Sequence, residues 1–333
     1  MIFFFLKIAF SIVPVFVFLA ALIYLDSYKL VHLRSVVTTI ILGCVVAGAA
    51  MAANYWPLTT PYRDSYIRYG APFVEELLKS VYPVYLIRSK KVGFMVDAAI
   101  RGFGIGAGFA FIENVYYLNS VSSTNLIVWA VRGFGTAVMH GGTTAILATV
   151  YKNMTDVKNS DDVKWLVPGF LTAVVIHSFF NHFFFSPLIS AVIVIAVLPV
   201  IMLFVFSQSE KSTRNWLGVG FDSDAALLNM ITTGNVAKTR IGVYLELLQT
   251  KFRGEVVADL LCYLRIYLEL AIQAKGILLM REAGFDVPAD PEIKAKFDEL
   301  QYLERSIGKT GQLAMAPFVR TSSNDLWQLQ LLQ

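Results

Sequence analysis

Cysteine and charge are both scarce in this sequence. Only two cysteines occur among the 333 residues, Cys44 and Cys262, and they lie far apart in the chain. This usage excludes a disulfide framework and a metal site built from cysteine thiolates. Charged residues make up 16% of the chain and hydrophobic residues 56%, and the mean hydropathy is +0.60. A composition this apolar excludes an ordinary soluble protein.

The apolar residues gather in segments that are long enough to cross a membrane. Runs of about 18–25 apolar residues span the ~30 Å hydrocarbon layer of a bilayer at 1.5 Å per residue. The sequence therefore predicts an all-α, polytopic membrane helix bundle of about seven spans in residues 1–207. The first segment could instead be a cleavable signal peptide, although its interruption by Lys7 favours a retained span. The segments cover roughly residues 5–25, 35–53, 71–87, 93–119, 125–151, 164–185 and 187–207.

Residues 208–333 have a different composition. They hold 14 basic and 15 acidic residues among helically spaced apolar side chains, so we expect a helical cytoplasmic tail with a regulatory or dimerising role. The basic surplus of residues 1–207 is that of lysines and arginines beside membrane spans, and it does not indicate nucleic-acid binding. One apolar face in the tail predicts packing against a partner helix, and it comprises Leu260, Leu261, Leu264, Tyr267, Leu268 and Ala271.

Basic residues in the short loops predict how the chain crosses the membrane. Lys29, Arg88 and Lys152 stand in loops after the first, third and fifth segments, and the alternate loops carry less positive charge. By the positive-inside rule, the basic loops and the tail face the cytoplasm and the N-terminus faces outside. The expected location is a bacterial inner membrane or plasma membrane.

Ionisable side chains inside four of these segments mark a candidate site. Glu75 and Glu76 are adjacent in the third segment, while Glu113, His140 and His177 lie in the fourth, fifth and sixth. The predicted topology brings these groups together in the outer half of the bilayer. Ionisable groups are costly in hydrocarbon unless they are paired or hydrated, so their presence indicates function.

These residue types suit the activation of a water molecule. A carboxylate can serve as general base and then as general acid, and an imidazole can bind a metal or donate to a developing oxyanion. Asn181 follows His177 by four residues, so it shares a helical face with it and could act as a second oxyanion donor. Lys79 has the same spacing from Glu75 and could hold that carboxylate ionised.

The same residues could instead have purely structural roles. A single histidine in a membrane helix is often an interhelical hydrogen-bond donor, and Glu76 could simply pair with Arg132. His182 falls near the outer interface, where we expect a structural role. Two interleaved G-x-x-x-G faces predict close helix packing in the fourth segment, and they consist of Gly102, Gly104, Gly106 and Gly108.

Four motifs in this order resemble those of the PrsW-type intramembrane proteases, relatives of the CAAX prenyl proteases and bacteriocin-processing membrane enzymes. They are E-E-x-x-K at 75–79, F-A-x-x-E-N at 109–114, the His140-Gly141 element and H-x-x-x-N at 177–181. The resemblance covers about residues 70–185. Lys79 stands where the wider superfamily often has arginine, and Thr136 stands where it often has phenylalanine, which favours the PrsW branch.

The resemblance implies cleavage of a membrane-anchored protein, such as an anti-sigma factor in an envelope stress response. It implies Glu75 as general base, with Glu76 in support. Three nitrogen and oxygen ligands would suit Zn²⁺ with one open position for water. The implied ligands or base-orienting groups are Glu113, His140 and His177, and the implied oxyanion stabilisers are His177 and Asn181.

The residues by themselves leave two other functions open. A proton-coupled transporter could use the same carboxylates and histidines as a relay, although the sequence has no obvious inverted repeat. A non-enzymatic receptor could bind a peptide within the membrane and signal through its tail.

Overall fold

The chain folds into helices that form two compact units, Met1–Glu210 and Lys211–Gln333. Every regular element within the described residues is a helix, which confirms the predicted all-α class. The start of the predicted fifth segment, 125–127, lies outside the described part of the chain. The computed structural model describes residues 2–120, 128–129, 131–182, 184, 187–285, 287, 290–319 and 323–332.

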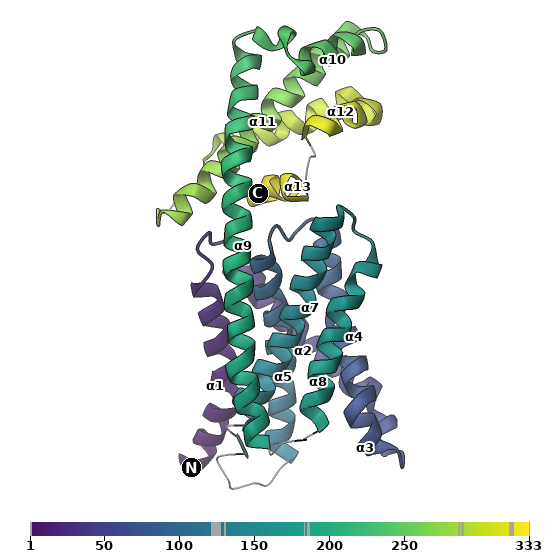
Figure 1. The fold of residues 1–333 in the computed structure, drawn as a ribbon, viewed down its shortest axis with the longest axis vertical. Coiled ribbons are helices and arrows are strands. Elements are labelled where there is room, and N and C mark those ends of the chain that lie inside the picture. Colours follow the sequence, from purple (N-terminus) through teal and green to yellow (C-terminus); the bar gives the residue numbers. More distant parts are fainter. Residues whose placement is uncertain are drawn as a thin grey trace. The chain divides into compact units, whose positions relative to one another are not determined.

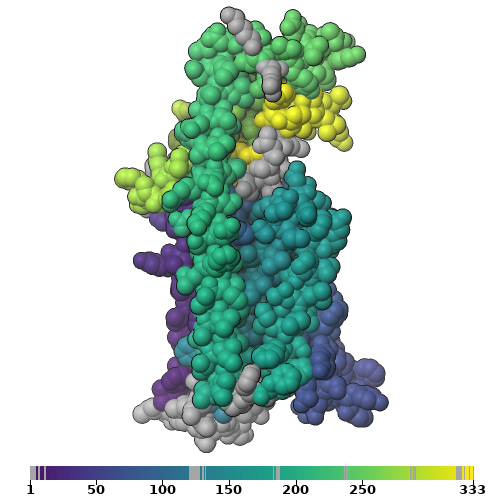
Figure 2. All heavy atoms as spheres, viewed as in Figure 1, coloured from purple at the N-terminus to yellow at the C-terminus, as the bar shows by residue number. Residues whose placement is uncertain are grey.

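The first unit is a bundle whose helices run alongside one another (Figure 1). Two short π-helical segments, η2 and η3, directly precede α4 and α7. Side chains of α8 and of the first part of α9 cover one face of the bundle (Figure 2). The elements are α1 (Ile2–Tyr24), α2 (Leu33–Tyr55), η1 (Pro57–Thr59), α3 (Arg63–Ser65), η2 (Tyr66–Gly70), α4 (Ala71–Arg88), α5 (Met95–Ser120), η3 (Val131–Thr136), α7 (Ala137–Lys158), η4 (Val163–Leu166), α8 (Val167–His182) and the first part of α9 (Pro187–Thr232), whose residues after Glu210 belong to the second unit.

Four of the described helices are long and apolar enough to cross a membrane. They cover Leu33–Tyr55, Met95–Asn119, Val163–His182 and Leu188–Thr232. Helices α4 and α7 have lower hydropathy because both carry charged side chains, and a shorter apolar stretch, Ile8–Tyr24, lies within α1. The polytopic membrane bundle is therefore confirmed, and the number of seven spans stays a prediction.

Helix α5 is largely buried and packs closely against α2 and α7 through its glycines. A Cβ atom added at Gly106 would lie 2.1 Å from the carbonyl oxygen of His140 on α7. On the opposite face, a Cβ atom added at Gly108 would lie 2.0 Å from the carbonyl oxygen of Ile40 on α2. Gly102 likewise faces α7, and Gly104 faces α2. The two predicted glycine faces are thus confirmed, each against a different helix.

The second unit has a hydrophobic core of its own. The predicted apolar face of α11 lies in this core against α12, with Leu261 partly buried and the other five residues buried. Gly308 has a φ of 63° and kinks α12, a conformation that suits glycine. The cytoplasmic position of this unit stays a prediction. After α9, its helices are η5 (Asn235–Lys238), α10 (Arg240–Leu248), α11 (Gly254–Glu282), α12 (Glu292–Val319), α13 (Ser323–Gln328) and η6 (Leu329–Leu332).

Replacing Gly108 by alanine should destabilise the membrane bundle, because the new methyl group has no room beside the backbone of α2. Overpacking of this kind costs about 1–3 kcal/mol. The matched control is Gly48→Ala on α2, where nothing lies within 4 Å of an added Cβ atom. Thermal unfolding in detergent micelles should give a lower midpoint for Gly108→Ala and an unchanged or higher one for Gly48→Ala. Equal midpoints for both variants would contradict this packing.

Candidate active site

The adjacent glutamates of α4 point toward different helices. Successive helical residues are rotated by about 100°, so the two side chains diverge. Glu76 is fully buried and contacts groups from α7 and α8. Glu75 is 15% exposed at its side chain and contacts α2 and α8. The two adjacent residues of α4 therefore place one carboxylate against α7 and α8 and the other against α2 and α8.

Glu76 is the centre of a buried polar network. Its Oε1 atom accepts from Lys79 Nζ at 2.6 Å, from His177 Nδ1 at 2.8 Å and from Thr143 Oγ1 at 3.2 Å. Lys79 is also fully buried, and its ammonium lies 4.6 Å from the centre of the Phe109 ring. From its spacing in the sequence, Lys79 could hold Glu75 ionised. The hydrogen bond of its ammonium is to Glu76, one turn away at i, i+3.

The contacts of His177 fix which of its nitrogens is free for chemistry. Nδ1 must donate, because its partner is the Glu76 carboxylate at 2.8 Å. Nε2 then carries the lone pair, and it lies 3.8 Å from Glu75 Oε2. A carboxylate that holds the far nitrogen of a histidine in this way is the usual outer support of a metal-ligating imidazole.

His140 is held between a cation and a carboxylate. Lys79 Nζ lies 2.9 Å from His140 Nδ1, and Glu113 Oε2 lies 2.7 Å from His140 Nε2. The rings of His140 and His177 meet edge to face with their centroids 4.8 Å apart. Glu113 keeps 23% of its side chain exposed, so it is the most accessible of the three glutamates.

Asn181 does not direct its amide into this cluster. Its Nδ2 atom donates to the carbonyl oxygen of Ile67 at 3.1 Å, and Ser178 Oγ donates to that of Arg68 at 2.6 Å. Both acceptors belong to η2, so the C-terminal part of α8 holds the segment that leads into α4. His182 also lies apart, with Nδ1 donating to the carbonyl oxygen of Ser178 at 2.7 Å. The side chain of Arg132 lies outside the described part of the structure.

Three residues that the sequence analysis missed join the network. Thr143 donates to Glu76, Asn54 Nδ2 donates to Glu75 Oε1 at 3.0 Å, and Tyr66 donates to Asn54 Oδ1 at 2.7 Å. Asn54 is 5% exposed. The sequence gave only a weak signal for Asn54, which lies one residue past the predicted end of the second segment. An amide that is buried at such a position needs hydrogen-bond partners.

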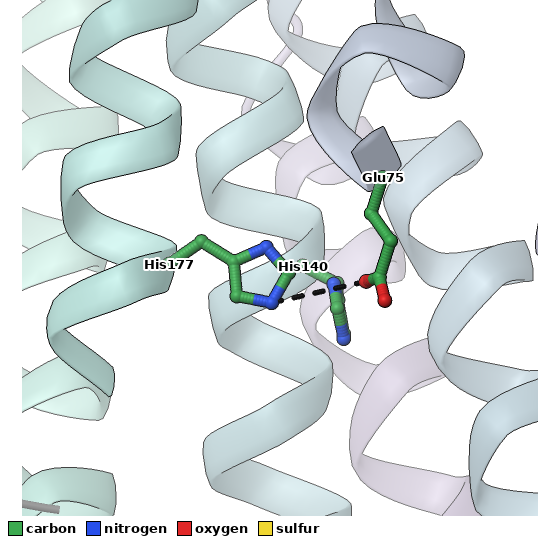
Figure 3. A group of neighbouring side chains, drawn as sticks. All are labelled: Glu75, His140 and His177. Atoms are coloured by element: carbon green, nitrogen blue, oxygen red, sulfur yellow. Dashed lines mark ion pairs between the residues drawn. The ribbon is translucent and has the colours of Figure 1, made fainter. Parts of the chain in front are cut away.

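The site can hold a metal ion. Glu75, His140 and His177 each offer a donor atom, and these atoms all lie within 4.8 Å of one another. Figure 3 shows the three side chains pointing toward one another from α4, α7 and α8. Two imidazoles and one carboxylate are a common donor set of catalytic zinc sites. The family resemblance implied Glu113 with the two histidines, whereas the three donor atoms that lie together here belong to Glu75, His140 and His177.

The fold and this site define a class: a polytopic membrane protein with a buried carboxylate–histidine centre suited to hydrolysis. A comparison with protein-family models matches residues 31–207 to the PrsW family of intramembrane metalloproteases. Because the match covers more than half of the chain, the protein belongs to this family. Searches of curated proteins and of solved structures gave no match.

Membership of the family establishes the type of activity. The protein is an intramembrane endopeptidase of the metalloprotease type, it resides in the membrane, and it acts on a membrane-embedded protein. The protease interpretation of the sequence is thereby supported over a transporter or a peptide-sensing receptor.

Replacing Glu76 by alanine should strongly destabilise the bundle, because the fully buried ammonium of Lys79 would lose its carboxylate partner. Removing one partner of a buried pair costs about 3–5 kcal/mol. The double variant Glu76→Ala/Lys79→Met should recover most of this loss, since no unpaired charge remains. Thermal unfolding in detergent tests both variants. A single variant as stable as the wild type would show that the pair is not structurally important.

Proposed function

We propose that the protein hydrolyses a peptide bond of a membrane-anchored protein at the centre formed by Glu75, Glu113, His140 and His177. The observation that carries this proposal is the convergence of a carboxylate and two imidazoles, within 4.8 Å of one another, inside the bundle of a metalloprotease family. These side chains come from helices that are far apart in sequence, so their convergence is a property of the fold.

Glu75, His140 and His177 would hold Zn²⁺, and the contact between Glu76 and His177 Nδ1 supports this set. His140 would bind through Nδ1 in place of its contact with Lys79, because its Nε2 atom donates to Glu113. When bound, zinc supplies a Lewis acid that makes a water molecule more acidic and polarises the scissile carbonyl. Glu113 is the better candidate for the general base, because it is more exposed than Glu75 and borders the same centre through His140. This assignment exchanges the roles that the family resemblance implied for the two glutamates.

The side chains can then carry out hydrolysis in two proton transfers. Glu113 takes a proton from water as the water oxygen attacks the carbonyl carbon of the substrate. Glu113 returns that proton to the amide nitrogen as the carbon–nitrogen bond breaks, which leaves a carboxylic acid and an amine. Lys79 holds Glu76 in place, and Glu76 in turn holds His177 through its Nδ1 atom.

The substrate that suits this site is a single-span or membrane-anchored protein cut close to the membrane. With the predicted topology, the centre lies in the outer half of the bilayer, so the cut falls toward the extracytoplasmic side. An anti-sigma factor of an envelope stress response would be a substrate of this kind.

Replacing Glu75 by glutamine should abolish proteolysis without preventing membrane insertion. We expect at least one membrane-anchored protein to accumulate intact in cells that express only this variant, measured by quantitative proteomics of isolated membranes. The matched control is Asp162→Asn, an exposed carboxylate that caps η4, because asparagine can cap a helix equally well. Identical membrane proteomes for Glu75→Gln and the wild type would contradict the proposed activity.

Zinc content separates the two possible roles of the glutamates. After zinc loading and desalting, purified Glu75→Gln and His177→Ala should lose most of their zinc, measured by elemental analysis. Glu113→Gln should keep its zinc and still be inactive, because it removes the base and no ligand. His182→Ala serves as the control for the loss of an imidazole outside the centre. Zinc lost from Glu113→Gln and kept in Glu75→Gln would reverse the assignment.

A further inference from the structure

Asn54 on α2 contacts the active centre from outside all the sequence motifs. Its Nδ2 atom donates to Glu75 Oε1 at 3.0 Å, and its side chain is almost completely buried. The other oxygen of that carboxylate, Oε2, faces His177 Nε2 at 3.8 Å. The amide therefore occupies one oxygen of Glu75 and leaves the other turned toward the histidines.

Tyr66 determines the orientation of this amide. Its hydroxyl group donates to Asn54 Oδ1 at 2.7 Å, so Oδ1 is occupied and the NH₂ group must face Glu75. The flipped amide would direct its oxygen against the carboxylate of Glu75, and two acceptors repel each other. The contacts with Tyr66 and with Glu75 therefore both support the same placement of the amide oxygen and nitrogen of Asn54.

The position of Tyr66 is itself constrained by η2 and α8. Gly70 has no side chain, and a Cβ atom there would lie 2.3 Å from Cδ2 of the Tyr66 ring. Asn181 and Ser178 donate to two carbonyl groups of η2, at Ile67 and Arg68. The helix that carries His177 therefore also holds the segment that carries Tyr66.

We propose that Asn54, oriented by Tyr66, is a positioning residue that presents Glu75 Oε2 to the metal. This inference rests on the proposed ligand set of Glu75, His140 and His177. A carboxylate on a flexible side chain samples several rotamers, and a hydrogen bond to one oxygen restricts it to the orientation that binds. Loss of such an outer contact typically weakens metal binding by about 10–100-fold.

Zinc affinity tests the proposal without a substrate. The full-length protein in detergent is titrated with Zn²⁺ in competition with a chelating indicator, and the dissociation constant is compared among variants. Asn54→Ala should raise the dissociation constant by about 10–100-fold. Thr39→Ala is the control for α2, because its buried hydroxyl group bonds only to Val36 of its own helix among the described contacts, and it should bind like the wild type.

A double-variant cycle shows whether Tyr66 acts through Asn54. Tyr66→Phe removes only a hydroxyl group, so it keeps the fold and should weaken zinc binding by less than Asn54→Ala does. In an Asn54→Ala background, Tyr66→Phe should have no further effect, since the amide it orients is absent. Additive effects of the two substitutions would overturn the proposed order of contacts.

The controls separate failure of this inference from failure of the proposed function. If His177→Ala binds zinc as tightly as the wild type, the ligand set itself is wrong. If His177→Ala loses zinc while Asn54→Ala and Tyr66→Phe both keep the wild-type affinity, only the positioning role is wrong. Thermal unfolding of each variant identifies any that has lost its fold. If Asn54→Ala is one of these, the zinc dissociation constant of Tyr66→Phe decides whether the positioning role is correct.

Discussion

The fully buried pair of Glu76 and Lys79 organises the active centre. A carboxylate and an ammonium that are both fully buried in an apolar bundle need each other, because removing one partner leaves the other charge unpaired. Glu76 uses one oxygen to hold Lys79, Thr143 and His177, and Lys79 extends the network to His140. Helices α4, α7 and α8 are thereby joined by polar contacts, and both imidazoles have fixed orientations.

Close helix approach is the second constraint on the site. The glycines of α5 let the backbones of α2 and α7 approach α5 closely. As a result, Glu113 Oε2 on α5 lies 2.7 Å from His140 Nε2 on α7. Helix α8 contributes differently, since His177 enters the centre while Asn181 holds η2. The H-x-x-x-N motif therefore has one residue in the centre and one that positions the start of α4.

Much of the fold followed from the sequence. Long apolar runs predict helices because a bilayer leaves backbone groups no other partners, and the interleaved glycines predicted that α5 packs closely on two sides. The helical character of the second unit followed from the spacing of its apolar residues. Hydropathy alone does not identify α4 and α7 as membrane spans, because their charged residues lower the average hydropathy of each helix. In α4, these charged residues include the ones that form the site.

The sequence by itself determined the chemical inventory of the site: three glutamates, two histidines and a lysine in apolar segments, in the order of the PrsW motifs. It could not decide their partners, since helical spacing offers Lys79 both glutamates and only the surrounding helices select Glu76. Tertiary structure alone brought Asn54 and Tyr66 to Glu75, and it turned Asn181 toward η2. Such contacts depend on how separate helices rotate and approach, and that information is absent from the periodicity of any one segment.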